Sequence, residues 1–134
     1  MVPLLAQQLE AAGFKVTQDV REYNQIESEA LAGKFHAVLV SRSTVLDSGD
    51  AVVYMTADFS SSGSYSMSGL HDEKVDAAIS KAAATQPGDE RHKAIMAAEQ
   101  AILASGAAIP LAHERLIQGE ASGVTGAERD PNER

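Results

Sequence analysis

The chain has 134 residues, of which 44% are hydrophobic and 22% charged, and its formal net charge is -8. This length holds one hydrophobic core, and the hydrophobic content is typical of a folded domain rather than a disordered chain. The acidic balance and the 4% of aromatic residues exclude a nucleic-acid surface, which needs basic and base-stacking side chains.

The sequence contains no cysteine, which excludes disulfides, thiol nucleophiles and thiolate metal sites. No stretch reaches the roughly 18 consecutive apolar residues that a membrane span needs. No basic-then-apolar export signal opens the sequence. Because such a signal is removed from a mature exported protein, these features leave the compartment open.

The first 41 residues predict a helix followed by a βαβ unit. Residues 3–12 place apolar side chains at helical spacing, with Pro3 in the first turn and Gly13 after the end. Residues 14–20 alternate apolar and polar positions, a helix follows from near Asn24 to Gly33, and residues 36–41 form a continuous apolar run. The two outer segments are therefore expected to be parallel strands of one sheet.

The middle of the chain has less regular patterning. Residues 52–59 suit either a short helix or a strand, and residues 60–69, "SSSGSYSMSG", form a serine-rich loop. This loop could be a linker between two domains, but too little chain lies on either side for two separate cores. We therefore expect a surface loop inside one domain.

Two helices and a short strand are predicted next. The first helix has Asp72 as its N-cap and a buried stripe, and the second begins near residues 87–90, buries Ile95, Ala98 and Ile102, and ends at Gly106. The stripe of the first helix is Val75, Ala78, Ile79 and Ala82. Residues 107–112, "AAIPLA", are predicted to form an edge strand because they contain a proline.

The order of these segments resembles the C-terminal lobe of the family 5 extracellular solute-binding proteins of ABC transporters, which bind dipeptides, oligopeptides or nickel. The segments that carry the resemblance are "LLAQQLEAAGFKV", "ALAGKFHAVLV", "YSMSGLHDEKVDAAISKA", "DERHKAIMAAEQAILASGAAIPLAHE" and "ASGVTG". The resemblance implies a single α/β domain over residues 1–134. It would be a periplasmic-binding-protein-like lobe with a mostly parallel sheet and covering helices, and most of the C-terminal lobe of a longer two-lobed protein.

The resemblance also implies a function. A peptide-like or other small solute would be held between this lobe and a missing N-terminal lobe and passed to a membrane permease. The parent protein would be extracellular or periplasmic, as a membrane-anchored lipoprotein, and would be no enzyme. No cofactor is implied, and the isolated lobe is expected to self-associate weakly through its uncovered cleft face.

Ligand contacts in open α/β sheets lie on the loops that follow the carboxyl ends of strands. The predicted contacts are therefore the loop residues Arg42, Ser43, Thr44, Val45 and Asp47, joined by Tyr65, Ser66 and Met67 of the serine-rich loop. Two interpretations of Arg42 are open. It holds a ligand carboxylate through two parallel hydrogen bonds, or it is a surface arginine that pairs with Asp47 or Asp50. Likewise, Tyr65 and Met67 suit loop anchors better than ligand walls.

Peptide-binding members carry an aspartate for the free amino group of the peptide where this chain has Val45. An ammonium buried there would lack an anionic partner unless Asp47 substitutes for it.

Two other classes of function are weighed against transport. The same pair of lobes serves as a solute-sensing domain in regulatory proteins. A small α/β enzyme would need a nucleophile and a base, yet the serines and histidines form no GxSxG elbow and no triad spacing. The four histidines, His36, His71, His92 and His113, are widely separated, so no metal site is expected.

Overall fold

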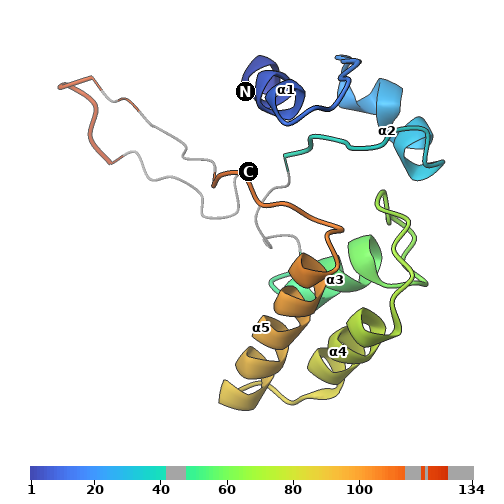
Figure 1. The fold of residues 1–134 in the computed structure, drawn as a ribbon. Coiled ribbons are helices and arrows are strands. Elements are labelled where there is room, and N and C mark those ends of the chain that lie inside the picture. Colours follow the sequence, from blue (N-terminus) through green and yellow to red (C-terminus); the bar gives the residue numbers. More distant parts are fainter. Residues whose placement is uncertain (42–47, 114–118, 120, 127–134) are drawn as a thin grey trace.

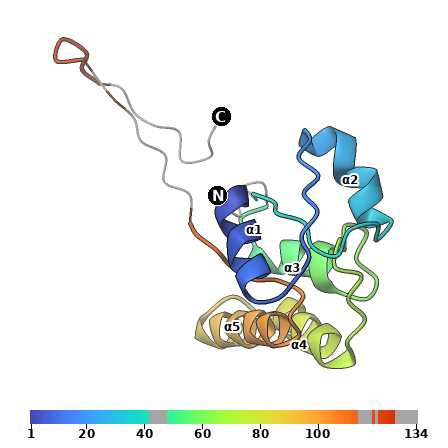
Figure 2. The same cartoon turned by 45° about the horizontal axis from the view of Figure 1, so that its top comes forward.

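The computed structural model describes residues 1–41, 48–113, 119 and 121–126. This described part contains five α-helices: α1 (Val2–Ala11), α2 (Tyr23–Leu31), α3 (Ala51–Phe59), α4 (Glu73–Ala84) and α5 (Asp89–Ala104). Figures 1 and 2 show α4 and α5 side by side with α3 packed across them. We call these three helices the three-helix unit; α1 and α2 lie beside it (Figure 1).

Local sequence signals explain where the helices of the three-helix unit begin and end. The Asp50 carboxylate accepts a hydrogen bond from the Val52 N–H at 3.0 Å, and Asp72 accepts one from the Lys74 N–H at 2.8 Å. Both aspartates thus satisfy amide donors that the first helical turn leaves free. Helix α5 ends before Gly106, whose φ of 76° is a left-handed conformation that glycine adopts without steric cost.

The core lies between α3, α4 and α5. Its buried members are Val52, Val75, Ile79, Ala82, Ala94, Ala98 and Ile102, with Met55, Phe59, Leu70, Ala78, Ile95, Ala101 and Ala108 packed around them. The many alanines let the helix backbones approach closely. Of the predicted α4 stripe, Val75, Ile79 and Ala82 are buried and Ala78 is only partly buried. On α5, Ala98 and Ile102 are buried and Ile95 is only partly buried.

The predicted α/β fold is wrong, because the described part of the chain is all-helical and contains no strand. Residues 14–20, 36–41 and 107–112 run without helix or strand, so the expected parallel sheet does not form. A strand exists only through hydrogen bonds to a second strand, and apolar alternation does not supply that partner. Phe14, Val20 and Ile109 accordingly remain 64%, 72% and 77% exposed.

Candidate functional site

The predicted ligand contacts fall into two groups. Arg42, Ser43, Thr44, Val45 and Asp47 lie outside the described residues. Tyr65, Ser66 and Met67 are partly buried in the loop that joins α3 to α4. The Tyr65 hydroxyl is hydrogen-bonded to the Tyr23 hydroxyl of α2. Tyr65 therefore ties α2 to the serine-rich loop.

The surroundings of Tyr65 fit this anchoring role. The hydrogen bond to Tyr23, followed by burial and a hydrogen bond to Glu27, raises the pKa of Tyr65 above its ordinary value. The phenol stays protonated at neutral pH. Tyr65, Ser66 and Met67 do not line either hollow of the groove described next.

Two adjoining hollows form an open groove along α3 and α4. The larger has a volume of about 510 Å³ and is lined by Asp50, Val52, Val53, Thr56, Ala57, Ser62, Gly63, Ser64, Ala83 and Arg91. The smaller has a volume of about 340 Å³ and is lined by Thr56, Ser60, Ser61, Ser62, Asp76, Ile79, Ser80 and Ala83. Thr56, Ser62 and Ala83 belong to both hollows, so we treat them as one groove.

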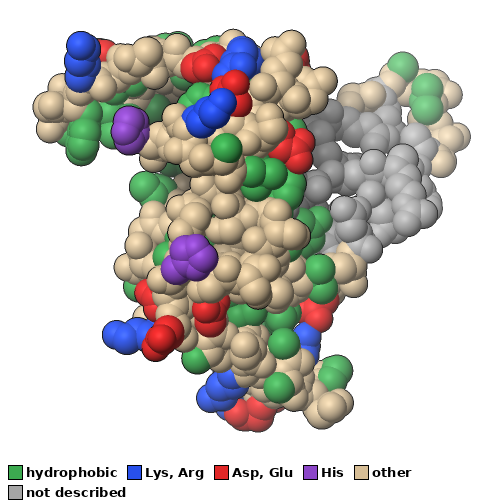
Figure 3. Space-filling view, turned by 90° about the vertical axis from the view of Figure 1, so that its right-hand side faces the viewer, with side chains coloured by type: hydrophobic (Ala, Val, Ile, Leu, Met, Phe, Trp, Pro, Cys, Tyr) green, Lys and Arg blue, Asp and Glu red, His purple; other side chains and the backbone are tan. Residues whose placement is uncertain are grey.

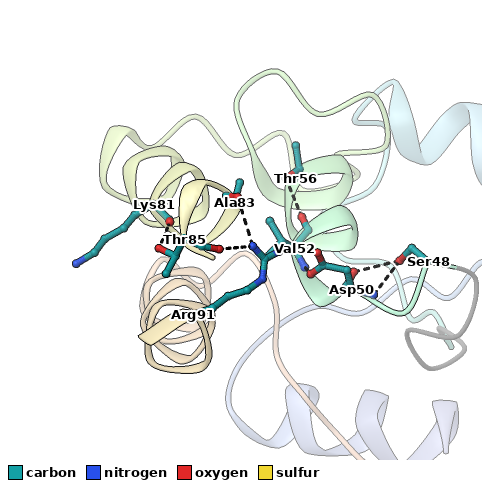
Figure 4. A network of polar contacts seen from close by, with 8 residues as sticks. All are labelled: Ser48, Asp50, Val52, Thr56, Lys81, Ala83, Thr85 and Arg91. Carbon is teal, nitrogen blue, oxygen red and sulfur yellow. Dashed lines mark hydrogen bonds and ion pairs between the residues drawn. The ribbon is translucent and has the colours of Figure 1, made fainter. Parts of the chain in front are cut away.

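An ion pair closes one end of the groove. The Arg91 guanidinium of α5 donates to the Asp50 carboxylate at 2.5 Å, and it also donates to the carbonyl oxygens of Thr85 at 2.7 Å and Ala83 at 3.3 Å. Figure 4 shows these contacts reaching from α5 to the end of α4 and to the start of α3. Because Asp50 is also the N-cap of α3, one arginine joins all three helices at this point.

Hydroxyl groups and a second carboxylate form the other end. The buried Ser60 hydroxyl donates to the Thr56 carbonyl at 2.7 Å, and the Ser61 N–H donates to the Asp76 carboxylate of α4 at 2.8 Å. Hydrogen bonds from the Ser61 side chain and N–H lower the pKa of Asp76 below its ordinary value, so this carboxylate is ionised at neutral pH.

The serine-rich loop is held tightly against α3. The Tyr65 N–H donates to the Ala57 carbonyl at 3.0 Å, and a Cβ added at Gly63 would lie 2.4 Å from the same oxygen. Only glycine allows this close approach. This packing on α3 makes the serine-rich loop one wall of the groove.

Gly63→Ala is expected to destabilise the protein by about 1–3 kcal/mol, because the methyl group meets backbone atoms that cannot rotate away. The free energy of unfolding from urea denaturation measures this effect. Gly119→Ala is the matched control, since an added Cβ there meets nothing within 4 Å, and its effect should stay within about 0.5 kcal/mol. Equal effects of the two substitutions would contradict the close packing of the loop.

Sequence reasoning missed Arg91 and Asp76 and considered Asp50 only as a surface partner of Arg42. Asp50 carries a visible signal, because it directly precedes the apolar run of α3 and so suits an N-cap. Arg91 gives no such signal, since it reads as one more polar residue of an amphipathic helix. Its partner Asp50 lies 41 positions away in the sequence.

The described residues restrict the chemistry of the groove. They contain no group of three or more His, Asp or Glu side chains that could hold a metal ion. No helix among the described residues is both long and apolar enough to cross a bilayer.

Figure 3 shows the face that carries the serine-rich loop. Charged side chains gather towards the two ends of this face, and mostly uncharged atoms lie between them. Comparisons with protein-family models, with curated proteins and with solved structures gave no match.

Proposed function

We propose that the chain is part of a solute-binding protein of an ABC importer and that its groove holds one side of a small solute. The groove is the observation that carries this proposal. Its walls combine apolar side chains with a few fixed polar groups, the combination that small-molecule sites use. The order of segments resembling family 5 binding proteins adds the transport role.

The polar groups of the groove suit binding better than catalysis. Asp50 and Arg91 neutralise each other, and Asp76 is hydrogen-bonded to the loop. These groups are held in place before any ligand arrives, which lowers the entropic cost of binding. No pair of them forms a nucleophile and its base, so a solute is expected to leave the protein chemically unchanged.

The groove is open on one side, so this chain alone covers only part of a solute. Small-molecule sites typically bury about 70–90% of the ligand surface. We propose that the remaining contacts come from another lobe of a longer parent protein, which closes over the groove before delivery to the permease. Affinity of the isolated chain is then weak, and its uncovered face self-associates weakly.

Native mass spectrometry and titration calorimetry test the proposal together. The full-length parent protein should retain a small solute in the mass spectrum. The isolated chain, titrated with di- and tripeptides and nickel chelates, should form no 1:1 complex of micromolar or better affinity. A tight complex of the isolated chain would contradict the need for a second lobe, and recovery of a chemically altered solute would indicate an enzyme instead.

A further inference from the structure

Three hydroxyl groups of the groove, those of Thr56, Ser60 and Ser62, use their protons in hydrogen bonds within the protein. The Thr56 hydroxyl donates to the Val52 carbonyl at 2.7 Å, and the Ser60 hydroxyl donates to the Thr56 carbonyl at 2.7 Å. With its own proton committed, Ser60 accepts in its 3.3 Å contact with the Ser62 hydroxyl, which must then donate. A hydroxyl whose proton is used in this way offers only lone pairs to a ligand. The hydroxyl oxygens of Thr56, Ser60 and Ser62 are therefore available only as hydrogen-bond acceptors.

The charged side chains of the groove, like its hydroxyl groups, favour a ligand that donates hydrogen bonds. Among the described residues that line it, two are carboxylates, Asp50 and Asp76, and one is a cation, Arg91. Arg91 is paired with Asp50 and with two backbone carbonyls, so it does not compensate Asp76. The Ser61 N–H and the Ser61 side chain take two of the roughly four acceptor positions of the Asp76 carboxylate. One negative charge and about two acceptor positions remain for a ligand.

We propose that the groove takes a small organic cation that carries a primary ammonium group. The ammonium, with three N–H donors, pairs with Asp76 and donates to the hydroxyl oxygens of Ser62 and Thr56. This inference rests on the proposed solute-binding function and names the class of solute for that same groove. The net charge of -8 favours the same ligands, because it draws cations toward the surface at long range.

An NMR titration of the whole chain with 1,4-diaminobutane tests the inference, and butane-1,4-diol is the neutral counterpart of similar length. The diamine should shift the amide resonances of Ser61, Ser62 and Asp76 saturably, and the diol should bind at least about tenfold more weakly. Asp76→Asn keeps an oxygen that can accept from the Ser61 N–H but removes the charge. It should weaken diamine binding about tenfold.

Two further variants keep the test decisive. Asp89→Asn changes the net charge equally at an exposed position of α5 and should leave diamine binding unchanged. Ser62→Ala alters an exposed side chain, retains the fold even if Asp76→Asn does not, and should weaken diamine binding about fivefold. Equal weakening by Asp89→Asn and Asp76→Asn would overturn the inference in favour of diffuse charge attraction.

The remaining outcomes separate this inference from the proposed function. Binding of the diol as tightly as the diamine at these amides, unaffected by Asp76→Asn, would overturn the cationic class while supporting a solute groove. No saturable shift with either compound would overturn the inference. The native mass spectrum of the full-length protein would then decide the solute-binding function by itself.

Discussion

Replacing Ile102 with alanine is expected to lower the free energy of unfolding by about 2–4 kcal/mol. Ile102 is 4% exposed and belongs to the core between α3, α4 and α5. The shorter alanine side chain buries less apolar surface. It also leaves a cavity, because helices that already pack closely cannot move together to fill it. Urea denaturation followed by circular dichroism measures the loss.

The neighbouring residue Leu103 gives the control for this prediction. It lies on the same helix but is 39% exposed, so Leu103→Ala should cost less than about 1 kcal/mol. A loss below about 0.5 kcal/mol for Ile102→Ala would mean that the buried face of α5 is assigned wrongly.

The second large effect is expected for Arg91→Met, which should destabilise the protein by about 2 kcal/mol. The side chain of Arg91 is only 18% exposed, and methionine keeps much of its apolar stem. The substitution removes the charge partner of Asp50 and leaves the carbonyl oxygens of Ala83 and Thr85 without their donor. Unfolding in urea at low and high salt measures the loss and its electrostatic part.

Lys93→Met is the matched control, because Lys93 pairs with Glu90 on the same helix with both side chains more than two-thirds exposed. Such exposed pairs contribute little, so the change should stay within about 0.5 kcal/mol. Asp50→Asn keeps an N-cap acceptor for α3 but removes the charge. A double-mutant cycle of Arg91→Met with Asp50→Asn should give a coupling energy of about 1 kcal/mol or more, and additive effects would contradict a stabilising ion pair.

The helices of the three-helix unit could be predicted because their signals are local. Asp72, the α4 stripe and Gly106 each act within a few residues of their own position. The structure confirms Asp72 as the N-cap, Gly106 as the end of α5, and the burial of every stripe residue except Ala78, which is partly buried. The pattern of residues 52–59 fits either a helix or a strand, since a run of eight residues holds too little periodicity to separate them, and the structure shows that it belongs to the helix α3.

The sheet could not be predicted from the same kind of signal. The alternation in residues 14–20 and the apolar run of residues 36–41 are patterns typical of paired strands. Pairing itself depends on distant segments, which these local patterns do not specify. The groove could not be predicted for a related reason, because its Asp50–Arg91 ion pair joins residues that are 41 positions apart in the sequence. Loop residues within 42–47 and 65–67 are both predicted to contact a ligand. The first group lies outside the described residues, and the part of the serine-rich loop that lines the groove is Ser60–Ser64 rather than Tyr65–Met67.

The short connection between α4 and α5 has a consequence for how the protein acquires its structure. Only residues 85–88 separate the two helices, so the contacts between them join positions that are close along the chain. Closing so short a loop costs little entropy, and proteins rich in local contacts fold rapidly. The α4–α5 hairpin is thus suited to act as the folding nucleus, onto which α3 and its serine-rich loop dock to create the groove.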